Sequence, residues 1–133
     1  MNKVIWTNGC FDILHRGHIE LFKYAKSLGD VLVVGIDSDA RIRKSKGRMR
    51  PINKLEDRVE ILTSIKYIDR VVRFDSDEEL EAKVLASGAV TMVIGSDYKN
   101  KKVIGSQYVK EIMFYRKIDG YSTTKILEHS SSR

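Results

Sequence analysis

The chain has 133 residues, 42% of them hydrophobic and 32% charged, a composition typical of one globular domain and not of a disordered chain. No apolar stretch reaches the roughly 18–20 residues of a membrane-spanning helix, and the N-terminus lacks the apolar core of a signal peptide. The single cysteine, Cys10, excludes an internal disulfide and favours a reducing compartment, so we expect a cytoplasmic protein without membrane attachment.

The net charge of +6 favours an anionic partner. Six Lys/Arg and no acid fall between residues 41 and 50, and three lysines cluster between residues 99 and 102. Both clusters lie near polar motifs instead of along an amphipathic helix, which indicates a small phosphate ligand more than a membrane surface.

Short apolar runs alternate with helical patterns along the chain. The runs predict five strands, at residues 4–7, 31–36, 71–74, 90–94 and 112–115. Four helices are predicted between and after these strands. The first has the apolar face Ile19, Phe22, Ala25 and Leu28 and stops at Gly29, and the second has the face Leu55, Val59, Leu62 and Ile65 after an Asn53 N-cap with Glu56. The third has the face Leu80, Val84 and Leu85 between a Ser76–Glu79 capping box and Gly88, and the last runs from Ser122 to about Leu127.

This alternation predicts an α/β fold, a single Rossmann-like domain whose five-stranded parallel sheet is flanked by helices. The domain is expected to span residues 1–129, with residues 130–133 as a tail. Ligands of such sheets bind beyond the carboxyl ends of the strands. That rule selects four polar loops, at residues 8–17, 37–50, 95–102 and 116–124.

The segment 8–18 carries the strongest chemical signal. Gly9 allows a turn after the first strand, and Gly17 allows the backbone to approach a ligand. His15 and His18 are three residues apart at a helix start, so they share one face beside the partly positive helix N-terminus. The segment therefore predicts an anion site with two imidazole donors. Zinc binding is disfavoured because a third ligand at suitable spacing is missing.

The run from Phe11-Asp12 to His15-x-Gly17-His18 resembles the HxGH signature of the cytidylyltransferase-like nucleotidyltransferases. Residues 120–126 resemble the second signature of that family, a Ser-Thr-Thr segment that opens the final helix. Both motifs occur in the family's order, so the resemblance covers essentially the whole chain. It implies binding of a nucleoside triphosphate with Mg²⁺ or another divalent cation, and relatives are commonly homodimers or larger.

Three further stretches are similar to sugar-phosphate adenylyltransferases that act on D-glycero-β-D-manno-heptose 1-phosphate in lipopolysaccharide biosynthesis: residues 7–12, residues 50–58 and residues 95–106. The alternative is a glycerol-3-phosphate cytidylyltransferase, which shares the Ser-Thr-Thr-Lys-Ile ending. Those enzymes carry an arginine where this chain has Lys117. The expected partners are thus ATP or CTP and a phosphorylated sugar or polyol.

The resemblance and the loop positions imply three groups of site residues. The catalytic residues would be His15, His18 and Lys46. The nucleotide-binding residues would be Asn8, Gly9, Phe11, Gly17, Ser122, Thr123 and Thr124. The acceptor-binding residues would be Asp12, Lys44, Arg58, Asp97, Tyr98 and Lys117, and no protein side chain is assigned to the metal.

Two other classes of protein remain as rivals. A regulator that binds nucleotide without catalysis is disfavoured because the motif residues are intact. An RNA-binding domain is suggested by the basic charge, but no RNA-binding motif with stacking aromatics supports it. We therefore expect no nucleic-acid partner.

Overall fold

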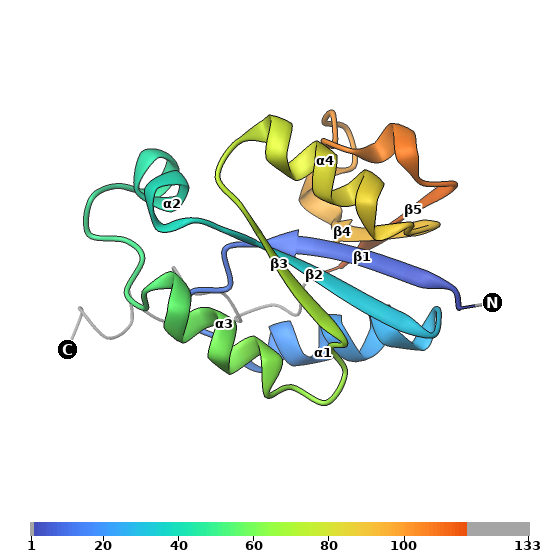
Figure 1. Ribbon diagram of the computed structural model, residues 1–133, viewed down its shortest axis with the longest axis horizontal. Helices are drawn as coiled ribbons and strands as arrows, with labels where there is room; N and C mark the ends of the chain where they lie inside the picture. Colours follow the sequence, from blue (N-terminus) through green and yellow to red (C-terminus); the bar gives the residue numbers. More distant parts are fainter. Residues whose placement is uncertain (1, 117–133) are drawn as a thin grey trace.

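Five parallel strands form the centre of the molecule, which the computed structural model describes over residues 2–116 (Figure 1). The strands are β1 (Val4–Gly9), β2 (Val31–Asp37), β3 (Arg70–Phe74), β4 (Thr91–Gly95) and β5 (Glu111–Tyr115). The helices are α1 (Arg16–Ser27), α2 (Asp39–Lys46), α3 (Leu55–Thr63) and α4 (Asp77–Ser87), with two short 3₁₀ turns, η1 (Ser96–Tyr98) and η2 (Ser106–Tyr108).

The strand order is β3-β2-β1-β4-β5, and every paired strand is parallel. The chain adds β2 and β3 on one side of β1 and then crosses to the other side for β4 and β5. The order therefore reverses between β1 and β4. In open α/β sheets this switch point is where ligands bind, beyond the carboxyl ends of the strands. The prediction of a Rossmann-like parallel sheet is confirmed.

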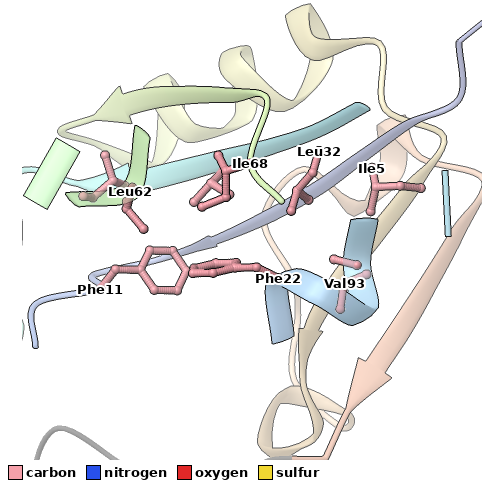
Figure 2. Packing of buried hydrophobic residues seen from close by; sticks show 10 residues of the cluster. Ile5, Phe11, Phe22, Leu32, Leu62, Ile68 and Val93 are labelled. Atoms are coloured by element: carbon pink, nitrogen blue, oxygen red, sulfur yellow. The ribbon is translucent and has the colours of Figure 1, made fainter. Parts of the chain in front are cut away.

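Both faces of the sheet are covered, as Figure 1 shows: α1 and α3 lie on one face and α4 on the other. Along β1, Ile5 faces the first core and Trp6 the second, as the two-residue period of a strand requires. Figure 2 shows the first core, where Phe22 of α1 and Leu62 of α3 pack against sheet residues such as Leu32. Burial on both faces explains why the strands read as continuous apolar runs.

Gly35 makes room for the indole of Trp6 in the second core. A Cβ atom at position 35 would lie 2.6 Å from Cζ2 of Trp6, closer than packed carbon atoms approach. A glycine inside β2 therefore allows a large aromatic ring to be buried completely against the centre of the sheet.

Three sequence-based predictions about helices are wrong. Residues 39–46 were expected to form a loop but form α2. Ser38 caps this helix, because its hydroxyl accepts a hydrogen bond from the Arg41 N–H. Asn53 does not cap α3; Lys54 holds the cap position, without a side-chain bond. Leu85 is 58% exposed, so it is not part of the buried face of α4.

The other helix signals agree with the structure. The Ser76 hydroxyl accepts from the Glu79 N–H at the start of α4, and Gly88 ends that helix in the left-handed region at φ 71°. Across residues 2–116 no helix is long and apolar enough to cross a membrane. The expected final helix and the boundary at residue 129 lie outside the described residues.

Candidate functional site

A cleft of about 1100 Å³ opens at the carboxyl ends of the strands, at the switch point between β1 and β4. Residues from all five strand ends line it, including the β3–α4 loop, which the sequence reading did not select. The predicted site residues among its lining are Asn8, Gly9, Phe11, His15, Gly17, His18, Lys44, Lys46, Asp97 and Tyr98. The structure thus brings most of the expected residues into one cavity.

The turn after β1 is built on Phe11, whose backbone has a left-handed φ of 46°. Such a conformation is uncommon for a bulky residue, so the surrounding structure must hold it. The Phe11 ring is 5% exposed and lies over Gly9, where a Cβ atom would come within 3.1 Å of it. Phe11 also packs edge-on against Phe22 of α1, which fixes the loop to the core (Figure 2).

His15 and His18 lie together at the start of α1, as predicted. His15 is the N-cap, and its Nδ1 accepts from the Gly17 N–H at 3.0 Å. Nδ1 of His18 accepts in turn from the His15 N–H at 3.1 Å, and the ring centroids are 3.9 Å apart. A neutral imidazole whose Nδ1 accepts a hydrogen bond carries its proton on Nε2. Both rings therefore present an Nε2–H group as a donor.

Asn8, the residue before the end of β1, has its side chain fixed by a hydrogen bond. Its Oδ1 accepts a hydrogen bond of 2.8 Å from the indole Nε1 of Trp6, which is completely buried. The amide nitrogen of Asn8 therefore remains the donor side of a group that lines the cleft. This contact links the buried Trp6 to the floor of the site.

Lys44 and Lys46 reach the cleft from α2, on the β2 side of the histidines. Both belong to the last turn of the helix, and Gly47 follows with φ 100°. The cleft therefore has imidazole donors on one side and two ammonium groups on another, which is an arrangement suited to a polyanion.

The ends of β2 and β3 form one wall of the cleft; the sequence predicted the loop after β2 to lie there but not the β3–α4 loop. Nε of Arg41 donates to Oδ1 of Asp37 at 2.8 Å, and Nη2 of Arg41 donates to Oδ1 of Asp77 at 2.7 Å. Burial raises the pKa of Asp37 above its ordinary value, although the Arg41 bond opposes the shift. The available sequence signal was the helix cap at Ser76. It follows β3 directly and so places the β3–α4 loop at the carboxyl edge of the sheet.

The structure corrects the acceptor-binding role expected for Asp12. Its side chain is fully buried and accepts from the backbone N–H groups of Ile52 and Asn53, at 2.7 Å and 2.8 Å, and from Nε of Arg50 at 3.2 Å. These bonds use both carboxylate oxygens. Asp12 therefore fixes the segment before α3 to the HxGH-like loop and does not line the cleft.

The acceptor-binding role expected for Arg58 is corrected in the same way. Its guanidinium is completely buried and donates to the carbonyl oxygens of Cys10, Asp37 and Asn53, at 2.8 to 3.0 Å. It also donates to Oδ1 of Asp39 at 2.6 Å. These bonds join the ends of β1 and β2 to the starts of α2 and α3. The Arg58 guanidinium therefore binds protein groups and does not face a substrate phosphate.

The β4 side of the cleft carries Asp97 and Tyr98 on η1. Tyr98 is 49% exposed, and Nζ of Lys101 lies 5.4 Å from its ring centroid. Lys102 lines the same wall, so the second basic cluster reaches the cleft. The expected residues Lys117, Ser122, Thr123 and Thr124 lie outside the described residues.

Metal ligands do not cluster in the described part of the chain. Residues 2–116 contain no group of three or more His, Cys, Asp or Glu side chains that could hold a metal ion.

Comparisons with known proteins extend this picture. The family model described as cytidylyltransferase-like matches residues 6–132. The chain is 46% identical over 126 residues to the "Bifunctional protein HldE" of Campylobacter concisus, covering 95% of this chain and 26% of that protein. The protein of the same name from Helicobacter pylori strain 26695 is 45% identical over 126 residues, with 95% and 27% covered. The chain thus spans about a quarter of the length of these curated relatives.

Solved structures agree with the fold. The "lipopolysaccharide core biosynthesis protein" of Thermoplasma volcanium matches with a TM-score of 0.74 and 27% identity, over 90% of this chain and all of that one. A pantoate-β-alanine ligase from Francisella tularensis matches with a TM-score of 0.60 and 16% identity, over 98% of this chain and 69% of that one. The second likeness concerns the fold alone.

Proposed function

Because the chain belongs to the cytidylyltransferase-like family of nucleotidyltransferases, we propose that it transfers AMP from ATP to a sugar 1-phosphate and releases pyrophosphate. The acceptor proposed is D-glycero-β-D-manno-heptose 1-phosphate. The observation that carries the reaction type is the cleft itself, where His15 and His18 stand on one side and Lys44 and Lys46 on another.

The sugar is proposed from three supporting observations. Residues 7–12, 50–58 and 95–106 resemble heptose-phosphate adenylyltransferases. The relatives carry the name HldE and are described as bifunctional, and the chain corresponds to about a quarter of their length. That proportion suits one of two activities joined in a longer protein. The Thermoplasma volcanium neighbour is described as a lipopolysaccharide core biosynthesis protein, which fits the same class of sugar.

In the proposed reaction an oxygen of the acceptor phosphate attacks the α-phosphorus of ATP. The new P–O bond forms as the bond between the α-phosphorus and the bridging oxygen breaks, and the electron pair leaves on pyrophosphate. Two polyanions must therefore be brought together, and charge develops on the α-phosphate oxygens. Positioning and charge neutralisation supply most of the catalysis of such steps.

Each side of the cleft has a role in this scheme. The Nε2–H groups of His15 and His18 would donate to the triphosphate, with His18 at the α-phosphate. Lys46 would bridge the acceptor phosphate and the α-phosphate, with Lys44 beside it. Asp97 and Tyr98 would contact acceptor hydroxyls. The proposal also assigns phosphate or acceptor contacts to Ser122, Thr123, Thr124 and Lys117.

We propose that Mg²⁺ enters as its complex with the triphosphate. The described residues offer no three-ligand cluster, but Asp97 lines the cleft and would hold water molecules of the hydrated ion. The ion would neutralise charge on the phosphates. The protein's own part is to hold donors where that charge develops.

The experiment is a pyrophosphate-release screen with ATP and CTP, each against D-glycero-β-D-manno-heptose 1-phosphate and glycerol 3-phosphate. The proposal predicts turnover with ATP and the heptose phosphate. Turnover only with CTP and glycerol 3-phosphate would replace the proposed substrates by those of the cytidylyltransferase alternative. Nucleotide binding without pyrophosphate release from any pair would instead support a non-catalytic regulator.

A further inference from the structure

Helix α2 carries Lys44 and Lys46 but has little packing of its own. Of its eight residues, Asp39–Lys46, only Ile42 is buried. Most helices are held by an amphipathic face against a core, and a helix this short is marginal in isolation. The position of the two lysines over the cleft must therefore depend on other contacts.

Two arginines supply these contacts: the buried Arg58 binds Asp39 at the start of α2, and Arg41 binds from within α2. Nε of Arg41 donates to Asp37 at the end of β2, and its Nη2 donates to Asp77 at the start of α4. The guanidinium also lies 5.3 Å from the ring centroid of Phe74 at the end of β3. One planar cation thus joins α2 to the ends of β2 and β3 and to the start of α4, a geometry that lysine cannot reproduce.

Ser38 strengthens the same junction. Its N–H donates to the Phe74 carbonyl at 3.0 Å, and its hydroxyl is hydrogen-bonded to the Asp75 carboxylate. The same hydroxyl accepts from the Arg41 N–H and so caps α2. The start of α2 is therefore bound to the β3–α4 loop, while Arg41 prevents the first turn from rotating about the helix axis.

We infer that Arg41 is a positioning residue of the transfer reaction: by clamping α2 to Asp37 and Asp77, it holds Lys44 and Lys46 over the cleft. The inference rests on the proposed function, because it assigns the lysines to the acceptor and α-phosphates. Nε and Nη2 of Arg41 bind carboxylates of the protein, and the residue also lines the cleft, so a double-variant background is needed to separate positioning from direct contact. His15 and His18 lie on another element and are not moved by this clamp.

The test compares Arg41→Met with Arg43→Met, a matched control that removes the same charge from an exposed position of the same helix. Pyrophosphate release is measured with the acceptor and ATP varied in turn. We expect Arg41→Met to lower kcat/KM for the acceptor by roughly ten- to a hundredfold, since small misplacements of positioning groups cost about that much. The KM for ATP should stay within about twofold, and Arg41→Lys should resemble Arg41→Met because one ammonium cannot span both carboxylates.

A second arm separates positioning from direct contact. In a Lys44→Met/Lys46→Met background, adding Arg41→Met should change the residual rate by less than about twofold, because the groups through which it acts are gone. A full additional loss in that background would overturn the inference. Equal kinetics for Arg41→Met and Arg43→Met would overturn it as well.

Hydrogen exchange makes failure of the inference distinguishable from failure of the proposed function. In Arg41→Met the amides of α2 should exchange about tenfold faster than in the wild type, while those of β2 stay unchanged. Unchanged exchange in α2 would contradict the clamp whatever the substrates are. Absence of pyrophosphate release from the wild type, with faster exchange in the variant, would contradict the proposed function and, with it, the catalytic role given to the clamp.

Discussion

Asp12 and Asn53 bind each other in both directions across 41 positions of the chain: the Asn53 N–H donates to Oδ1 of Asp12, and Nδ2 of Asn53 donates to the Asp12 carbonyl. The pair joins the HxGH-like loop to the segment before α3. It explains why Asp12 is buried and why Asn53 does not cap a helix. A residue inside the HxGH-like loop thus has an architectural task.

Asp12→Asn should therefore reduce stability. The amide keeps one acceptor but turns an NH₂ group toward a backbone donor, and it leaves the Arg50 guanidinium without its partner. Breaking a buried ion pair from one side costs about 3–5 kcal/mol in the free energy of unfolding. Urea denaturation measures this. Asp57→Asn, an exposed carboxylate of α3, is the control and should cost about 1 kcal/mol or less; equal losses for the two variants would contradict the architectural role.

Arg58→Met should be at least as damaging. The substitution leaves the partly buried carbonyl oxygens of Cys10, Asp37 and Asn53 without the donor they have in the wild type, and an acceptor that loses its partner in the interior costs about 1–3 kcal/mol. Thermal unfolding should show a large fall in Tm, with little rescue by Arg58→Lys because an ammonium lacks the planar fork. Arg73→Met, at an exposed position of β3, should change Tm little. A Tm of Arg58→Met close to that of Arg73→Met would refute the prediction.

At the opposite end of the sheet, the contacts of Asp69 should make the free energy of unfolding depend on pH. Oδ2 of Asp69 accepts from Nζ of Lys26 at 2.6 Å and from the Leu32 N–H at 2.7 Å. Partial burial opposes ionisation, but these bonds outweigh it and lower the pKa of Asp69. Because the folded-state pKa is depressed, the stabilisation is complete above the unfolded value of about 3.9 and is lost as pH falls through the folded value.

Denaturation of the wild type and Asp69→Asn between pH 7 and pH 2 checks this sign. The wild type should lose more stability on the acid side, so that the two curves converge at low pH. Lys26→Met should reduce the acid dependence as well, since it removes one of the two donors. Parallel curves over the whole range would show that Asp69 is not linked to folding in this way.

Lys46→Met should reduce turnover by about 10²- to 10³-fold, the cost of losing one preorganised donor to a transition-state charge. The control is Arg48→Met, which removes an exposed cation two residues further on. Steady-state pyrophosphate release measures both variants. Similar rates for the two would mean that the basic segment acts through its overall charge and not through Lys46.

Local patterns were sufficient to predict the sheet and most of the cleft. Buried parallel strands read as apolar runs, and the residues that follow them, such as His18 and Asp97, meet at one edge by the geometry of the fold. Helix α2 was missed because it buries Ile42 alone and so shows no apolar period. Its Ser38 cap was the available signal.

The roles of Asp12 and Arg58 could not be predicted in the same way. Their partners lie up to 48 positions away, and no local pattern reports which carbonyl or N–H a buried charge will meet. The clamp of Arg41 onto Asp77 is equally non-local. Sequence signals of this kind identify the elements that approach the site, whereas the division between catalytic and architectural charges depends on tertiary packing.

The most direct test of the proposed nucleotidyl transfer is the rate of pyrophosphate release by His18→Ala with ATP and the heptose phosphate. The substitution removes the imidazole assigned to the α-phosphate, and it also removes the acceptor of the His15 N–H. A loss of about 10²- to 10³-fold in kcat, with the fold retained by circular dichroism, is the predicted result. Release at the wild-type rate would contradict the assignment of this cleft as the site of the reaction.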